Sequence, residues 1–119
     1  MRLIVGIDGS ETAMKGLDEV VTRAQQMGDE VTVAVYAPDD SLAAVETTVR
    51  ARLDELGFEA EIEPIEDDPG SRLVHLAETG EYDRIVLSGG KTSPLGKIQL
   101  GTVTEFVLLN SHTSVTLIR

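Results

Sequence analysis

Two kinds of hydrophobic pattern alternate along the chain. The first is a short continuous apolar run, such as Leu3–Ile7, which has the length of a strand buried on both faces. The second is a set of apolar residues that recur at steps of three and four, which is the spacing along one face of a helix. From Ala13 to Met27 this spacing predicts a helix, with Ser10 as its N-cap and Gly28 at its end.

The same two patterns repeat to the end of the chain. Phe58–Glu63 alternates between apolar residues and acids and is followed by Pro64, a combination typical of an edge strand. We expect further strands at Val31–Ala37, Arg84–Ser88 and Ser114–Ile118, and helices through residues 42–56, 68–79 and 103–110.

The strict alternation of five strands and four helices predicts one domain over residues 1–119 with an α/β fold. The sheet should be parallel and doubly wound, with right-handed crossovers and helices on both faces in three layers. With the acidic third strand at an edge, the natural strand order is 3-2-1-4-5. In that order the first and fourth strands flank the switch point, where ligands bind beyond the carboxyl ends of the strands. The loops after Ile7 and Ser88 would line this crevice.

Charge changes the picture of possible partners. The chain has 21 acids and 10 bases, for a net charge of −11. Such a surface repels phosphate backbones and anionic lipid, so we expect no general binding to nucleic acid or membranes. Lysine occurs only at positions 15, 91 and 97. Low lysine with many acids favours adaptation to high salt, because salt screens the self-repulsion. An ordinary acidic cytosolic protein is the alternative.

The absence of cysteine excludes disulfides and thiolate chemistry. No apolar run approaches the ~18 residues that span a bilayer. The opening residues lack the layout of a signal peptide, so we expect a cytoplasmic protein.

Asp8 directly follows the first predicted strand, at the switch point. A carboxylate there can accept hydrogen bonds from a ribose or an amino group. It can equally bond its own backbone in an Asp-Gly turn. The residues alone leave both roles open.

The segment from Gly89 to Thr102 carries the sharper signal. It is rich in glycine, contains two of the three lysines, Lys91 and Lys97, and leads into a helix at Gly101–Thr104. Glycines admit a phosphate close to the backbone, and a helix start presents free N–H groups, so the pattern predicts an anion site. A flexible surface loop is the alternative. A Walker A loop is excluded, because Ile85 stands where that motif needs glycine.

This arrangement resembles the universal stress protein family. In that family the fourth strand is followed by G-x2-G-x9-G-[ST], a loop that holds the phosphates and ribose of ATP in nucleotide-binding members. Gly90 matches the second glycine, and Gly101-Thr102 matches the closing pair. Residues 4–11 look like the family's opening strand with its aspartate, and residues 114–119 look like its terminal strand. Two features depart from the motif: Leu87 stands at the first glycine unless Gly89 substitutes, and ten residues separate Gly90 from Gly101.

The resemblance implies a protein that binds an adenine nucleotide such as ATP or AMP, with Mg²⁺ accompanying the nucleotide. Asp8 would approach the adenosine, and a backbone group at Val35 would contact adenine. The implied site comprises Ile7, Asp8, Val35, Leu87, Gly89, Gly90, Lys91, Gly101, Thr102, Val103 and Thr104.

The alternative within the family is a dimeric scaffold that binds no nucleotide, which the missing glycine and the longer loop favour. Either way, the apolar last strand, Ser114–Ile118, should form an edge that pairs with its own copy. A phosphotransfer or hydrolase domain ranks last, because the sequence lacks the acidic cluster and lysine placement that a receiver domain would need. No residue is placed as a base that activates water, so efficient hydrolysis is not expected. His75 and His112 stand apart from any acid or nucleophile in a recognisable spacing, so we expect surface histidines.

Overall fold

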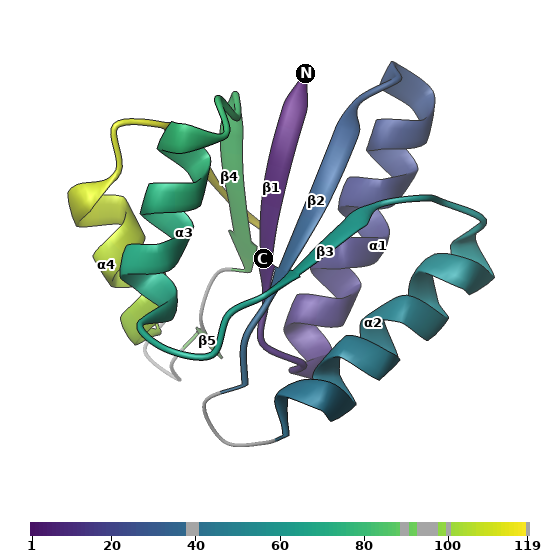
Figure 1. Cartoon of the computed structure of the whole chain (residues 1–119), viewed down its shortest axis with the longest axis horizontal. Coiled ribbons are helices and arrows are strands. Elements are labelled where there is room, and N and C mark those ends of the chain that lie inside the picture. The colour runs from purple at the N-terminus through teal and green to yellow at the C-terminus, as the bar shows by residue number, and fades with distance from the viewer. Residues whose placement is uncertain (38–40, 89–90, 93–97, 100, 119) are drawn as a thin grey trace.

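The computed structural model describes residues 1–37, 41–88, 91–92, 98–99 and 101–118. Strands and helices alternate as the hydrophobic pattern predicts (Figure 1). The elements are β1 (Arg2–Ile7), α1 (Glu11–Met27), β2 (Glu30–Val35), α2 (Leu42–Leu56), β3 (Glu61–Pro64), α3 (Pro69–Thr79), β4 (Arg84–Ser88), β5 (Lys91–Thr92), β6 (Ile98–Gln99), α4 (Thr102–Asn110) and β7 (Ser114–Ile118).

The main sheet is five-stranded and parallel, in the order β3-β2-β1-β4-β7. This order confirms the predicted 3-2-1-4-5 arrangement, with β3 and β7 at the edges. Helices α1 and α2 cover one face of the sheet, and α3 and α4 cover the other (Figure 1). The switch point therefore lies between β1 and β4. Among the described residues no helix is both long and apolar enough to cross a bilayer.

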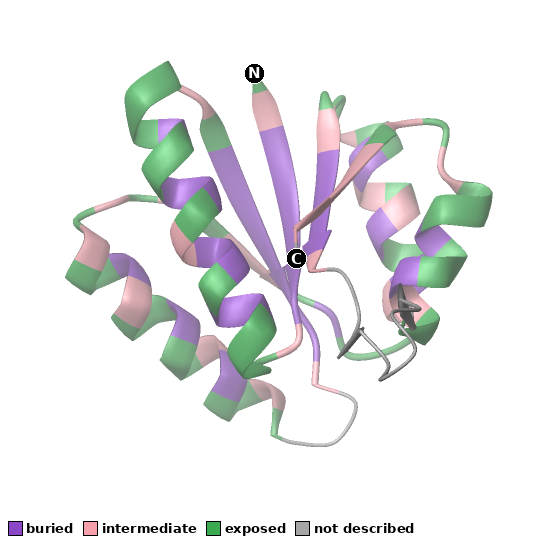
Figure 2. Ribbon diagram, turned by 180° about the vertical axis from the view of Figure 1, so that it is seen from behind, coloured by how far each residue is buried: buried purple, intermediate pink, exposed green. Residues whose placement is uncertain are grey.

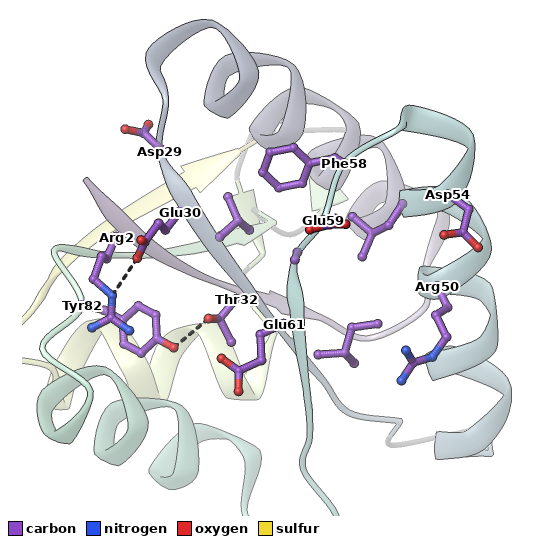
Figure 3. Close-up of a pocket in the computed structure, with 14 residues that line it drawn as sticks. Arg2, Asp29, Glu30, Thr32, Arg50, Asp54, Phe58, Glu59, Glu61 and Tyr82 are labelled. Carbon is purple, nitrogen blue, oxygen red and sulfur yellow. Dashed lines mark hydrogen bonds and ion pairs between the residues drawn. The ribbon is translucent and has the colours of Figure 1, made fainter.

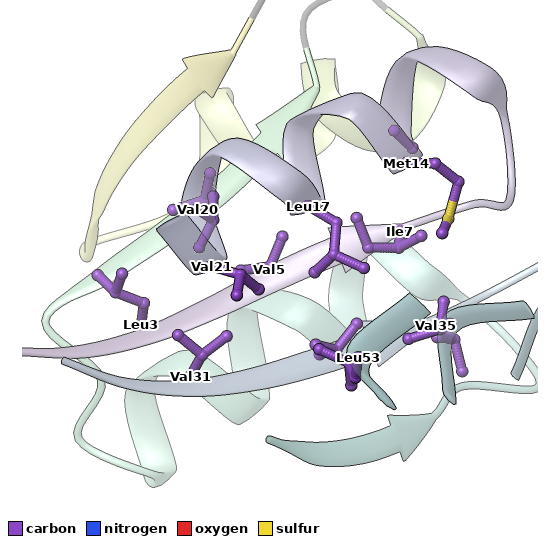
Figure 4. Packing of buried hydrophobic residues seen from close by; sticks show 14 of the residues in the cluster. Leu3, Val5, Ile7, Met14, Leu17, Val20, Val21, Val31, Val35 and Leu53 are labelled. Atoms are coloured by element: carbon purple, nitrogen blue, oxygen red, sulfur yellow. The ribbon is translucent and has the colours of Figure 1, made fainter. Parts of the chain in front are cut away.

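Each face of the sheet has its own hydrophobic core. Odd-numbered residues of β1 and β2 pack under α1 and α2, together with the buried stripe of α1 that includes Leu17 and Val21 (Figure 4). Even-numbered residues such as Ile4 and Ala34 pack against α3 and α4 with Leu73. The buried residues follow the strands and the inner faces of the helices (Figure 2). This alternation is the expected consequence of the two-residue period of a strand.

The caps predicted for the first helix are present, and the second helix is capped in the same way. The Ser10 hydroxyl accepts a hydrogen bond from the Ala13 amide at 3.1 Å, and the Ser41 hydroxyl accepts one from the Ala44 amide at 3.3 Å. Gly28 and Gly57 end α1 and α2 in the left-handed conformation, with φ of 72° and 63°. The serine and glycine capping residues therefore set the limits of these two helices.

The third strand is shorter than predicted. It begins at Glu61, because the Phe58 amide donates to the Leu53 carbonyl at 3.1 Å and so belongs to the C-terminal cap of α2. Pro64 lies inside the strand, opposite Val35. An edge strand tolerates proline because its backbone nitrogen faces away from the sheet.

The second strand ends at Val35 and not at Ala37. The predicted loop after β4 also contains two short strands, β5 and β6, which pair antiparallel with Lys91 opposite Gln99. Neither change alters the topology, because β5 and β6 form a sheet of their own.

Candidate functional site at the carboxyl edge of the sheet

Asp8 begins the turn that leaves β1 at the switch point. Its Oδ1 atom accepts a hydrogen bond from the Ser10 amide at 3.0 Å, and Gly9 between them has a φ of 83°. The turn role that the sequence left open is therefore present. The structure records no protein hydrogen bond to Oδ2 of this half-buried carboxylate within the described residues.

Glycine is required at position 9 for two reasons. Its backbone is left-handed, and a Cβ there would lie 2.9 Å from a Val45 methyl carbon. The close approach of α2 thus fixes the turn that presents Asp8.

Val35 has its side chain in the core under α1 and α2, and its carbonyl accepts the Ile65 amide at 2.8 Å. The next amide, that of Tyr36, donates to the Ile7 carbonyl at 3.1 Å. Tyr36 therefore lies beside the end of β1, one residue beyond the end of β2.

Tyr36 was not among the predicted site residues. Its ring lies in the core under α3 and α4, 3.5 Å from the position of a Cβ on Gly6. Burial raises the pKa of the Tyr36 phenol, and the negative charge of Asp8 raises it further. The phenol therefore remains a neutral donor beside the switch point. The sequence signal that could have identified Tyr36 is its position directly after a buried strand that ends at this edge.

Leu87 stands where the family's loop motif has its first glycine, and its side chain is turned into the core. It is 1% exposed and lies opposite Gly6 in the strand register. A Cβ on Gly6 would lie only 2.6 Å from a Leu87 methyl carbon and 3.2 Å from one of Leu73. Leu87 thus fills the space above Gly6 and offers only its backbone to the crevice. Ile7 is likewise 1% exposed and faces the opposite core.

The start of α4 lacks a side-chain cap. Gly101 is the N-cap residue, with φ −67° and ψ 161°, a conformation open to any residue. No atom lies within 4 Å of a Cβ built on Gly101. Nothing among the described residues therefore requires glycine here. The amides of Thr102, Val103 and Thr104 form the first turn that follows.

Several predicted positions fall elsewhere. Gly89 and Gly90 lie outside the described residues, and Lys91 belongs to β5. His75 and His112 are both exposed, as expected. Within the described part of the chain, no three His, Asp or Glu side chains are grouped so that they could hold a metal ion.

A hollow of about 670 Å³ lies at the opposite, amino-terminal edge (Figure 3). Several of its polar groups pair with one another. The Arg2 guanidinium stacks 4.5 Å from the centre of the Tyr82 ring and lies 3.3 Å from a Glu30 oxygen, and Tyr82 donates to the Thr32 hydroxyl at 2.7 Å. Arg2 also donates to the Gly80 carbonyl. These contacts fasten β1, β2 and the start of β4 together, which is a structural role.

The doubly wound parallel sheet has the Asp8 turn at its switch point and the start of α4 at Gly101, which is the architecture of a flavodoxin-like α/β protein. The model of the universal stress protein family matches residues 1–119. The chain therefore belongs to the universal stress protein family.

Known proteins agree with this assignment. The universal stress protein MJ0531 of Methanocaldococcus jannaschii is 24% identical over 139 residues, which cover 99% of this chain and 81% of the relative. UspA of Lactobacillus plantarum shares the fold with a TM-score of 0.82 at 20% identity, covering 100% of this chain and 97% of that one. A universal stress protein solved in complex with cAMP has a TM-score of 0.76 at 24% identity and coverages of 100% and 96%. One from Archaeoglobus fulgidus in complex with dAMP has a TM-score of 0.71 at 21% identity and coverages of 100% and 98%.

Proposed function

We propose that this protein is a stress-response module that binds an adenine nucleotide, ATP or AMP, at the carboxyl edge of its sheet. The observation that carries the proposal is the start of α4 at Gly101, which has no side-chain cap and, among the described residues, no atom near the position of a Cβ. Relatives solved with cAMP and dAMP support adenine as the base.

Different residues of the proposed site would contact the phosphates and the ribose. The amides of Thr102, Val103 and Thr104, with Lys91 and the glycines Gly89 and Gly90, would hold the phosphates at the positive end of α4. The free oxygen of Asp8 suits a ribose hydroxyl. Mg²⁺ would be held chiefly by the phosphates, because the described residues offer no grouped metal ligands.

Binding, and not turnover, is the proposed activity. Within the described residues no side chain is placed as a general base for water, and efficient ATP hydrolysis is not expected. The protein would act by changing its shape or its partners when the nucleotide binds.

The test is isothermal titration calorimetry with ATP at molar KCl and with Mg²⁺. We expect micromolar binding to the native chain and a loss of at least about tenfold for Gly101→Val, whose side chain would occupy the phosphate space. This variant should fold, because its backbone is extended and no atom lies near the new Cβ. Thr22→Val, an isosteric change on the exposed face of α1, is the control. Absence of heat at millimolar ATP with a folded native chain would refute nucleotide binding.

That negative result would favour the second candidate, a dimeric scaffold without nucleotide. The half-buried residues of β7 and the core position of Leu87 favour it. For both candidates we propose a homodimer through Ser114–Ile118. Val115→Lys, which places a charge on this edge, should convert a dimer to a monomer in sedimentation velocity.

We further propose that the protein works in the cytoplasm at high salt. With 21 acids against 10 bases, self-repulsion is relieved when the Debye length falls to ~3 Å at 1 M salt. The melting temperature should rise between 0.1 M and 2 M KCl. A flat or falling melting temperature would contradict salt adaptation.

A further inference from the structure

The phenolic group of Tyr36 has a hydrogen-bonding capacity that the fold leaves unused. The ring is buried in the core under α3 and α4, and the residue is 7% exposed. Its hydroxyl makes no recorded hydrogen bond among the described residues, whereas the hydroxyl of Tyr82, the other tyrosine of the chain, donates to Thr32 at 2.7 Å. Buried polar groups are normally paired, so the unpaired hydroxyl on this buried ring needs a physical reason.

The Tyr36 hydroxyl is not enclosed by the protein. In the described part of the chain, the side-chain atoms that are both enclosed and unbonded are Asp18 Oδ1 and Arg84 Nε. The phenolic oxygen is unbonded and is not one of these two, so it keeps accessible surface. The small remaining exposure of Tyr36 therefore includes the atom that could bind a ligand.

Gly6 leaves room for the ring of Tyr36 to lie across β1. A Cβ at Gly6 would lie 3.5 Å from Cε1 of Tyr36, the ring carbon next to the one that bears the hydroxyl. The phenolic end of the ring therefore lies over β1, which flanks the switch point together with β4. The hydroxyl is thus on the strand that presents Asp8.

Asp8 supplies an acceptor near this donor. Its Oδ1 atom accepts from the Ser10 amide, and no hydrogen bond to Oδ2 is recorded among the described residues. Burial raises the pKa of the Tyr36 phenol, and the nearby charge of Asp8 raises it further, so the phenol stays protonated and can donate. The phenol and the carboxylate do not bond each other among the recorded contacts, which leaves both for a third group.

We propose that Tyr36 and Asp8 together hold the ribose 2′-hydroxyl, and so select ribonucleotides over 2′-deoxyribonucleotides, an inference that rests on the nucleotide binding proposed above. The hydroxyl would accept from the Tyr36 phenol and donate to Asp8 Oδ2. Tyr36 comes from the end of β2, and β2 lies on the far side of β1 from β4 and β7, the strands that α4 connects (Figure 1). Tyr36 would therefore meet the ribose on the side remote from the 5′-phosphates, where the 2′-hydroxyl lies.

Other polar groups fit this pair less well. A phosphate would be repelled by the Asp8 carboxylate, and a carbonyl oxygen could accept from Tyr36 but would face the same negative charge. An amino group would satisfy Asp8 and leave the phenol proton without an acceptor. Of these groups only a hydroxyl both donates and accepts, so only a hydroxyl satisfies Tyr36 and Asp8 together.

The test is calorimetry of the full chain with ATP and with 2′-deoxy-ATP, at molar KCl and with Mg²⁺. We expect 2′-deoxy-ATP to bind about tenfold more weakly than ATP, because it leaves Tyr36 and Asp8 without a partner. Tyr36→Phe, which keeps the ring, should weaken ATP about tenfold and leave 2′-deoxy-ATP nearly unchanged. Tyr82→Phe removes the same group from the far end of the same core, so it is the matched control and should change neither affinity.

A second measurement needs no variant. The chain has two tyrosines, so protein grown with 3-fluorotyrosine should give two ¹⁹F NMR signals. ATP should shift the Tyr36 signal and leave the Tyr82 signal in place, and saturating 2′-deoxy-ATP should shift the Tyr36 signal less.

The outcomes separate this inference from nucleotide binding itself. If the native chain binds ATP and 2′-deoxy-ATP equally, or if the preference for ATP survives in Tyr36→Phe, the role of Tyr36 is refuted while nucleotide binding stands. An equal loss of both nucleotides in Tyr36→Phe would also refute it, because the ring would then act only through the shape of the site. No binding of either nucleotide to the folded native chain would refute both proposals.

Discussion

The two ends of the sheet treat their polar groups in opposite ways, and the two tyrosines of the chain show this best. Tyr82 lies at the amino-terminal edge, where its hydroxyl donates to Thr32 at 2.7 Å. Tyr36 lies at the carboxyl edge, and the structure records no hydrogen bond for its hydroxyl within the described residues. Both rings pack in the core under α3 and α4. The same core thus supports one end where the Tyr82 hydroxyl is paired and another where the Tyr36 hydroxyl has no recorded partner among the described residues.

The carboxyl edge also differs in how its glycines are used. Gly6 and Gly9 are required by close contacts, whereas Gly101 is required by none. Glycine at an N-cap costs only a few tenths of a kcal/mol relative to serine, so Gly101 is compatible with helix capping as well as with the proposed approach of a ligand to the backbone. Gly6 and Gly9 are thus explained by packing, whereas packing within the described residues does not explain Gly101.

The largest expected effect comes from the packing beneath the carboxyl edge. Gly6→Ala places a Cβ 2.6 Å from Leu87 and should lower the free energy of unfolding by about 2–3 kcal/mol, measured by urea denaturation. Adding Leu87→Ala should restore part of this loss, because the two side chains compete for one space. Additive effects of the two changes would mean that Leu87 is not held in place by Gly6.

The next largest effect concerns the ionisation of Tyr36. Because the pKa of Tyr36 is raised in the folded protein, its contribution to stability is complete below the unfolded pKa of about 10 and is lost as the pH rises above it. At pH 11 the loss should be about 1.4 kcal/mol relative to neutral pH, and Tyr36→Phe should abolish that part. Absorbance at 295 nm follows the ionisation. Ionisation of both tyrosines near pH 10 in the folded chain would contradict this.

The paired tyrosine should affect stability alone. Tyr82→Phe leaves the Thr32 hydroxyl, in a residue that is 7% exposed, without its partner and should cost about 1 kcal/mol in urea denaturation. Adding Thr32→Val should recover much of this cost. ATP affinity should not change in either variant, since both residues lie at the far end of the sheet. A change in ATP affinity would break the division between the two ends.

Much of this fold could be predicted from the sequence, because continuous apolar runs and helical spacing report burial directly. The start of β3 could not, because strict alternation does not reveal that the Phe58 amide is bonded to Leu53 at the end of α2. The match between Gly6 and Leu87 joins two strands that are far apart in sequence, so it becomes visible only with the register. From the sequence, Tyr36 is only one residue of the predicted strand Val31–Ala37. Its position beside the end of β1 becomes visible only in the folded structure.

The smallest expected change in stability provides the sharpest test of the carboxyl edge. Gly101→Ser supplies the side-chain cap that α4 lacks and should raise the free energy of unfolding by a few tenths of a kcal/mol. The same change should weaken ATP binding about tenfold in calorimetry, because the new side chain competes with phosphate for the same amides. Ser10→Ala, which removes a cap that the fold uses, should instead cost about 1 kcal/mol. If Gly101→Ser destabilised the protein as much as Ser10→Ala, glycine at position 101 would be structural, and the contrast between a paired and a free end of the sheet would fail where it matters most.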